Sequence, residues 1–214
     1  MKNISLFIGI AVILLIGGIL ISQNLLKEKE ISMPEKNLEG KKIVIITAFQ
    51  DFRDEEYFVP KEILEKAGAE IKTASNQKGT ARGADGGQVQ INLSTYEIDT
   101  NEFDAVVFIG GPGCLENLDN EDSYQVVKAT VNQNKVLASI CISPVILAKA
   151  GVLSGKKATV WTSLMDKSAV KILEDNGAVF ENKSVVVDGK IITASGPDAA
   201  REFGQKIVEA LTEK

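Results

Sequence analysis

Two cysteines are the strongest candidate nucleophiles in this sequence, and Cys141 occupies the more informative position of the two. The apolar residues 136–140 predict a buried strand that ends at Cys141, and residues 144–150 predict a helix directly after it. A thiol on such a turn projects above a sheet and faces helix N–H groups, which favour the thiolate and lower its pKa. The alternative is that Cys141 is a small buried apolar residue without chemical function.

A glycine-rich turn follows a second predicted strand. Residues 105–109 form another buried run that ends at Gly110-Gly111-Pro112-Gly113. In open α/β sheets, ligands bind outside the carboxyl ends of the strands. Glycine turns can supply backbone N–H donors to an anion or a developing oxyanion. We therefore expect a site where this turn and Cys141 meet.

The composition excludes several kinds of chemistry. The chain contains no histidine, which removes the commonest general base and the commonest metal ligand. Cys114 and Cys141 match no zinc-binding spacing, so we expect neither a metal site nor a cofactor. The 24 basic and 29 acidic residues are scattered along the chain, and this distribution does not predict nucleic-acid binding.

The remaining pattern alternates strands and helices, which predicts a mostly parallel sheet covered on both faces. Residues 76–88 are rich in glycine and are expected to be irregular. We assign one domain to residues 41–214. Its other strands are expected at 43–46, 71–74, 89–93, 158–161, 184–187 and 191–193, and its other helices at 55–67, 121–133, 166–175 and from 197 onward.

The N-terminal segment predicts a membrane anchor. Residues 3–26 carry no charged side chain, and residues 6–21 are apolar except for glycines. The alternative is a cleaved signal peptide, but no small-residue cleavage motif follows the apolar run. We assign residues 1–26 to a single-pass anchor and the polar residues 27–40 to a linker, with the domain on the extracytoplasmic side.

Three ordered motifs resemble the PfpI/DJ superfamily, a group with a class I glutamine-amidotransferase-like fold. They are Gly110-Gly111 after a strand, ASICISPVILAKAGVL around Cys141, and VVVDGKIITASGP near the C-terminus. The resemblance covers residues 41–212. It implies a flavodoxin-like three-layer α/β sandwich.

The resemblance also implies roles for individual residues. Cys141 matches the family's nucleophile at the strand-to-helix turn, and Glu56 matches the carboxyl group that contacts that thiol as a protonated donor. The N–H groups of Gly111 and Ile142 match the donors that bind an oxyanion or an oxidised sulfur. Glu56 has an alternative role as a solvated acid in the first turn of its helix. Glu116 resembles an acid that protease-like members donate across an oligomer interface, although this match requires an insertion.

The sequence departs from the family at both places where members carry histidine. Protease-like members read Cys-His-Gly-Pro, whereas this chain reads Cys141-Ile142-Ser143-Pro144, and the other histidine position aligns with Trp161. A cysteine peptidase is therefore disfavoured. We expect a membrane-tethered domain that uses Cys141 for glyoxalase-like, deglycase-like or oxidative-stress chemistry, with a small carbonyl compound or a peroxide as its reactant. The alternative is a non-catalytic binding or scaffold domain of the same fold.

Two further expectations concern Cys114 and oligomerisation. Cys114 is three residues beyond Gly111, so it is a candidate redox partner for Cys141, through a disulfide or as a resolving thiol. The favoured alternative is a packed loop cysteine, because thiols whose Cα atoms are more than about 7 Å apart cannot be bridged. Family members commonly form dimers, and the resemblance extends this expectation to a homodimer here.

Overall fold

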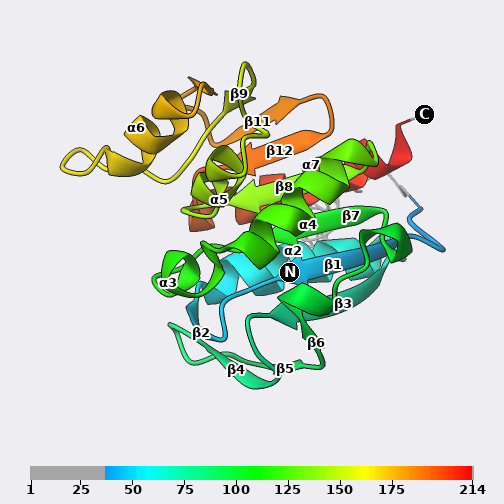
Figure 1. The fold of residues 1–214 in the computed structure, drawn as a ribbon. Helices are drawn as coiled ribbons and strands as arrows, with labels where there is room; N and C mark the ends of the chain where they lie inside the picture. Colours follow the sequence, from blue (N-terminus) through cyan, green and yellow to red (C-terminus); the bar gives the residue numbers. More distant parts are fainter. Residues whose placement is uncertain (1–36, 214) are drawn as a thin grey trace, which may run out of the picture. The chain divides into compact units, whose positions relative to one another are not determined.

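A seven-stranded sheet lies at the centre of the computed structural model, which describes residues 37–213 (Figure 1). Only β11 runs antiparallel to its neighbour within this sheet; the other pairings are parallel. The strand order, with bounds, is β11 (Val185–Asp188), β12 (Ile191–Ala194), β8 (Val136–Ile140), β7 (Ala105–Phe108), β1 (Lys42–Ile46), β3 (Glu70–Ser75) and β6 (Leu93–Ser94).

The central strands are mostly apolar and almost wholly buried because helices cover both of their faces. Every residue of β7 and β8 is buried, and so are the last four residues of β1. Continuous burial of this kind is typical of parallel strands, whereas a half-exposed strand would alternate apolar and polar residues. In register, Phe108 of β7 pairs with Ser139 of β8, and Ala194 of β12 pairs with Ile140. The carboxyl ends of these three strands therefore lie at one edge of the sheet.

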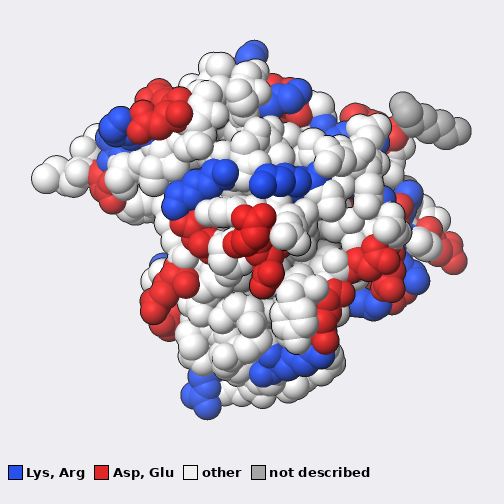
Figure 2. Space-filling view, viewed as in Figure 1, with Lys and Arg blue, Asp and Glu red and all other residues white. Residues whose placement is uncertain are grey.

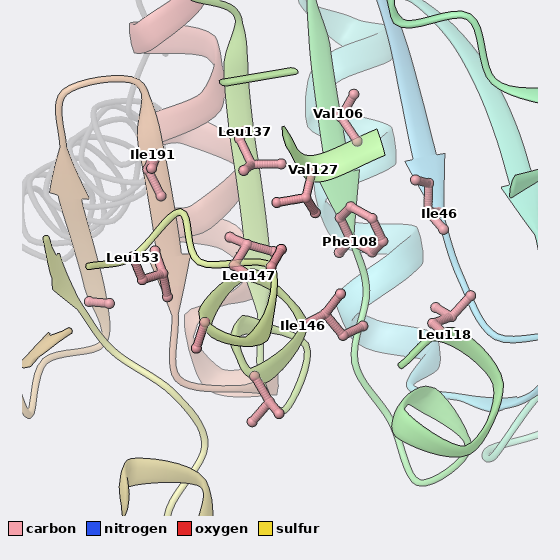
Figure 3. Close-up of a cluster of buried hydrophobic side chains, with 14 of the residues drawn as sticks. Ile46, Val106, Phe108, Leu118, Val127, Leu137, Ile146, Leu147, Leu153 and Ile191 are labelled. Atoms are coloured by element: carbon pink, nitrogen blue, oxygen red, sulfur yellow. The ribbon is translucent and has the colours of Figure 1, made fainter. Parts of the chain in front are cut away.

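Helices form a layer on each face. On one face, α2 (Asp54–Lys66) and α7 (Ala200–Thr212) pack together against a cluster that includes Tyr57, Leu64 and Phe203. The opposite face packs against a second cluster, part of which is shown in Figure 3. The helices on that face are α3 (Cys114–Leu118), α4 (Glu121–Asn132), α5 (Pro144–Lys149) and α6 (Ser168–Asp175). The predicted flavodoxin-like three-layer α/β sandwich is confirmed.

The prediction of an irregular segment at residues 76–88 was wrong. This region contains β4 (Gly79–Gly83) and most of the hairpin that β4 forms with β5 (Gln88–Ile91), and β2 (Gln50–Phe52) joins them in a three-stranded sheet. The Gly83 N–H donates to the Gly87 carbonyl across the turn at 2.8 Å. The glycines therefore close a hairpin between two short strands.

Two elements near the C-terminus also differ from expectation. The strand expected at 158–161 is reduced to β9 (Lys157–Ala158), which pairs with β10 (Val179–Phe180) in a separate two-stranded sheet. The final helix begins with a 3₁₀ turn, Pro197–Ala199, before α7. Two other 3₁₀ turns, Thr95–Glu97 and Thr100–Glu102, connect β6 to β7.

Leu38, which precedes the domain start assigned at residue 41, packs in the core cluster on one face of the sheet. Leu38 is fully buried, and its N–H donates to the Ala67 carbonyl at 2.6 Å. Glu39 and Gly40, which follow Leu38, are exposed. The predicted anchor at residues 1–26 lies outside the described residues. Within residues 37–213, no helix has the length and apolar character needed to cross a membrane.

Candidate active site

Cys141 occupies a strained turn between β8 and α5. Its φ angle is +66°, in the left-handed region that residues other than glycine seldom adopt. Both of its backbone groups are bonded to neighbouring segments: its N–H donates to the Ala194 carbonyl at 2.8 Å, and its carbonyl accepts from the Trp161 N–H at 2.7 Å. These bonds hold the strained conformation, which is a common feature of functional sites.

Ser143 holds the same turn from inside the protein. Its buried hydroxyl lies 2.8 Å from the Ser139 hydroxyl, 3.0 Å from the Phe108 carbonyl and 2.8 Å from the Ile140 carbonyl. It also accepts from the Ile140 N–H at 3.1 Å. One hydroxyl therefore links the ends of β7 and β8 to the start of α5. Sequence reasoning missed this role, although a serine immediately before Pro144 at a predicted helix start was a usable signal.

Two backbone N–H groups lie beside the Cys141 sulfur. The N–H groups of Gly111 and Ile142 lie close enough to lower the pKa of the thiol. The turn after β7 approaches very closely, because a Cβ atom at Gly110 would lie only 2.6 Å from the Cys141 Cβ. Glycine is thus required where the two strand ends meet. The donors are placed where they would stabilise negative charge on sulfur or on a bound oxygen.

Glu56 is the carboxyl group of the site. It lies in the first turn of α2 and is fully buried, so the alternative of a solvated acid is wrong. Its Oε2 accepts from the Gly110 N–H at 3.1 Å, its buried Oε1 has no hydrogen-bond partner, and the carboxyl lies close enough to the Cys141 thiol for each group to shift the pKa of the other. Burial raises the pKa of Glu56 from 4.5 to about 7, because desolvation outweighs the hydrogen bonds from Cys141 and Gly110 and the charge of Arg53. Glu56 can therefore exchange a proton near neutral pH.

The expected low pKa of Cys141 is not what the structure shows. Burial and the Glu56 carboxylate raise the pKa of Cys141 to about 12, and the N–H groups of Gly111 and Ile142 oppose this shift only in part. The reason is that two acidic groups share one desolvated space, so ionising one makes it harder to ionise the other. Over a wide pH range the Glu56 and Cys141 pair holds one proton between them. That proton can be on either group. The pair has the same net charge as a thiolate beside a protonated Glu56 and as a thiol beside a Glu56 carboxylate.

The buried carboxyl predicts a specific pH dependence of stability. The pKa of Glu56 is raised on folding, so its contribution is fully present below pH 4.5 and is lost as pH rises through about 7. We expect the unfolding free energy of the native protein, relative to Glu56→Gln, to fall by roughly 3 kcal/mol between pH 4 and pH 8. Chemical denaturation at several pH values measures this difference.

A matched control uses the exposed Glu174, for which we expect the Glu174→Gln variant to follow the pH profile of the native protein. Parallel profiles for native protein and Glu56→Gln would contradict a raised pKa at Glu56.

The other predicted residues lie beside the site without completing it. Cys114 is fully buried at the start of α3, and its N–H donates to the Gly111 carbonyl at 3.1 Å. Both cysteines are free thiols, and they pack against the clusters on opposite faces of the main sheet. Glu116 lies in the first turn of α3 and is exposed. No three His, Cys, Asp or Glu side chains between residues 37 and 213 are grouped as a metal site.

Comparison with known proteins identifies what this chain is similar to. Residues 41–210 match the family model described as DJ-1/PfpI family. An uncharacterized protein from Methanocaldococcus jannaschii is 39% identical over 177 residues, which are 82% of this chain and 85% of the relative. A protein from Pyrococcus furiosus named deglycase PfpI is 31% identical over 170 residues, which are 79% of this chain and 99% of the relative.

A solved structure agrees with these relatives. The crystal structure of a ThiJ/PfpI domain protein from Brachyspira murdochii matches with a TM-score of 0.74 and 35% sequence identity. The match covers 80% of this chain and 98% of that chain. Sequence and fold thus point to the same group of proteins.

Proposed function

Because the chain belongs to the DJ-1/PfpI family, we propose that it uses Cys141 as the nucleophile in reactive-carbonyl chemistry of the glyoxalase or deglycase kind. The observation that carries this proposal is the contact of one sulfur with two backbone N–H donors and a buried carboxyl of raised pKa. The name of the relative in Pyrococcus furiosus supports the reaction class. A 2-oxoaldehyde such as methylglyoxal is the proposed substrate.

In the first step the Cys141 thiolate forms a C–S bond with the aldehyde carbon. The carbonyl electron pair moves onto oxygen, which takes the proton held by Glu56, and a hemithioacetal results. The N–H groups of Gly111 and Ile142 stabilise the oxygen while it carries negative charge. The product of this step leaves Glu56 as a carboxylate, ready to act as a base.

In the second step Glu56 carries protons between neighbouring atoms. It removes the proton from the former aldehyde carbon and returns a proton to the neighbouring ketone carbon. The hydroxyl proton of the hemithioacetal passes to the ketone oxygen. A thioester of a 2-hydroxy acid results, and water hydrolyses it to the acid and the thiol. One carbon is oxidised and its neighbour is reduced by the same electron pair, so no outside oxidant is needed. A pKa of about 7 suits Glu56 to both directions of transfer.

The test is to incubate the full chain with methylglyoxal and to follow both the aldehyde and the protein. We expect the aldehyde to be converted to a 2-hydroxy acid and a transient adduct to be located on Cys141 by mass spectrometry. The pH profile of kcat/KM should contain a transition near pH 7 that Glu56→Gln removes. A chain that forms neither product nor adduct would contradict the proposed reaction.

The alternative is a non-catalytic domain that binds ligands at the same sheet edge. The observations that favour it are the complete absence of histidine and the raised pKa of the Cys141 thiol. Such a domain would show no turnover in the same assay. Exposure to hydrogen peroxide in parallel distinguishes a redox role, since oxidation of Cys141 would add oxygen to the protein mass without consuming aldehyde.

We also propose that the domain forms homodimers. A further proposal is that residues 6–21 anchor the chain in a membrane, with the domain on the extracytoplasmic side. The support for the anchor is the uncharged N-terminal sequence. The full chain should remain in the membrane fraction after alkaline carbonate extraction, whereas a chain beginning at Lys36 should be released. Release of both chains would contradict the anchor.

A further inference from the structure

The glycine turn at residues 110–113 lies against both reactive groups of the site. Its Gly110 N–H donates to the Glu56 carboxyl at 3.1 Å, and its Gly111 N–H lies beside the Cys141 sulfur. A Cβ atom at Gly110 would lie 2.6 Å from the Cys141 Cβ, so the turn and the thiol are in close contact. A small displacement of the turn would therefore move N–H donors away from both groups.

Two asparagine side chains connect this turn to neighbouring segments. Asn117 lies in α3, and its Nδ2 donates to the Gly113 carbonyl at 2.8 Å. Its Oδ1 accepts from the Asn76 Nδ2 at 2.9 Å. The Asn76 Oδ1 accepts in turn from the Phe49 N–H and from the Ser75 hydroxyl, both at 3.0 Å. The Asn76–Asn117 pair thus joins the glycine turn to the end of β3 and to the segment between β1 and β2.

The backbone groups at the two ends of this relay fix the orientation of both amides. The Gly113 carbonyl can only accept, so Asn117 must turn its nitrogen to it and its oxygen to Asn76. The Phe49 N–H can only donate, so Asn76 must turn its oxygen to it and its nitrogen to Asn117. An aspartate at either position would lack a donor that the relay requires.

Main-chain bonds connect the glycine turn to β2 as well. The Arg53 N–H donates to the Gly110 carbonyl at 3.2 Å, and the Gly113 N–H donates to the Asp51 carbonyl at 3.1 Å. Phe49 immediately precedes β2, so Asn76 holds the start of that strand while Asn117 holds the last residue of the turn. The two amides therefore tie together both partners of this main-chain contact.

Partial burial distinguishes the amide relay from the charged surface around it. Figure 2 shows acidic and basic side chains dispersed over the surface around α3 and α4, which lie in front in the matching view of Figure 1. Exposed ion pairs of this kind contribute little to stability. Asn76 and Asn117 are partly buried, and hydrogen bonds are stronger where water is partly excluded.

From these contacts we propose that the Asn76–Asn117 pair positions the glycine turn for the reaction at Cys141. The two asparagines are positioning residues, because they act through the Gly113 carbonyl and the start of β2. The inference rests on the proposed function and adds two residues to the machinery that stabilises charge during the reaction. A misplaced N–H donor stabilises the oxyanion less well, and this loss falls mainly on kcat.

The first test removes and then partly restores the bond to Gly113. Asn117→Ala should lower kcat for methylglyoxal roughly 10- to 100-fold, with KM within about 3-fold of the native value. Asn117→Ser should recover part of this loss, because a helical serine can donate to the carbonyl four residues earlier. A kcat in Asn117→Ala within about 2-fold of the native value would overturn the proposal, and so would a loss that Asn117→Ser does not reduce.

A matched control has the same bond at another place in the fold. Asn176 is also partly buried, and its Nδ2 donates to the Ile172 carbonyl, four residues earlier, at 2.8 Å. Asn176→Ala should lose a similar amount of thermal stability but should keep kcat. Equal losses of kcat in Asn176→Ala and Asn117→Ala would show that reduced stability lowers the rate, and would contradict a positioning role.

A double variant tests whether the two amides act as one unit. Once Asn117 is removed, the Asn76 amide no longer reaches the glycine turn. We therefore expect Asn76→Ala/Asn117→Ala to lower kcat to within about 3-fold of Asn117→Ala alone. Losses that multiply would show two independent effects and would contradict the relay.

Alkylation separates this proposal from the one on which it rests. Iodoacetamide forms an S–C bond with Cys141 as iodide leaves and the thiol proton passes to solvent, and peptide mapping by mass spectrometry gives the rate at this residue. Because the Gly111 N–H favours the thiolate, the rate at a fixed pH should fall several-fold in Asn117→Ala and recover in part in Asn117→Ser.

The two outcomes that matter are then distinct. If the native protein converts no methylglyoxal, the proposed function fails, and the alkylation rates still decide the role of the amides. If Asn117→Ala is alkylated at the native rate or faster, the positioning role is wrong whatever the turnover shows. Thermal unfolding of each variant confirms that the rates compare folded proteins.

Discussion

Cys141→Ser should lower kcat/KM for methylglyoxal by about a thousandfold or more. A serine hydroxyl is a far weaker acid than a thiol, and the chain contains no histidine that could deprotonate it. Glu56 alone would have to activate the hydroxyl, and its pKa of about 7 makes it a weak base for that purpose. Steady-state consumption of the aldehyde at pH 7.5 measures the effect.

The matched control is Cys114→Ala. Cys114 is fully buried at the start of α3 and packs in the cluster on the other face of the sheet from Cys141. We expect this variant to retain activity within a few-fold, with a modest loss of stability from the small cavity. Thermal unfolding of both variants shows whether either has lost its fold. Equal losses of activity at the two cysteines would contradict a unique role for Cys141.

Gly111→Ala should strongly destabilise the protein. The φ angle of Gly111 is +113°, and a Cβ atom there would lie 2.3 Å from the Arg53 backbone nitrogen and 2.6 Å from the Asp51 carbonyl oxygen. Both obstacles are backbone atoms, so the turn itself must move. We expect a loss of about 3 kcal/mol or more in unfolding free energy, together with loss of Cys141 reactivity, because the Gly111 N–H contacts the sulfur.

Gly155→Ala separates steric obstruction from backbone strain. Gly155 also has a positive φ angle, +72°, but a Cβ atom there would meet nothing within 4 Å. We therefore expect a loss of only about 1–2 kcal/mol, the usual cost of the left-handed region for a residue with a side chain. Chemical denaturation measures both variants. Similar losses at the two positions would show that obstruction at Gly111 is not the dominant effect.

Much of the fold was predictable because its central strands carry a strong pattern. The run at residues 136–140 was predicted with its exact bounds, since all five of its residues are buried and the turn at Cys141 follows directly. The contact between Glu56 and Cys141 could not be predicted from such a pattern. These residues are 85 positions apart, and no periodicity relates them, so only the family resemblance suggested the pair. The structure then confirmed that the carboxyl lies against the thiol.

What the sequence did not reveal depends on burial and on long-range contacts. The helix and turn N–H groups around Cys141 suggested a low thiol pKa, but burial of the thiol and the Glu56 carboxylate beside it outweigh those donors. The hairpin of β4 and β5 was missed because glycine density indicates a turn and an irregular loop equally well. Ser143 was overlooked because its link to the Phe108 carbonyl of β7 spans 35 residues, so its role in joining β7 to the end of β8 exists only in the folded chain.

The hydrogen bonds that pin the backbone of Cys141 mean that this nucleophile is preorganised. Its orientation is set when β8, β12 and the segment at Trp161 assemble, so the entropy of placing the sulfur is lost during folding and not when a reactant arrives. No loop closure is then required to build the reactive geometry. The same coupling makes the rate of Cys141 alkylation a local reporter of cooperative unfolding, because opening any of these three segments releases the turn.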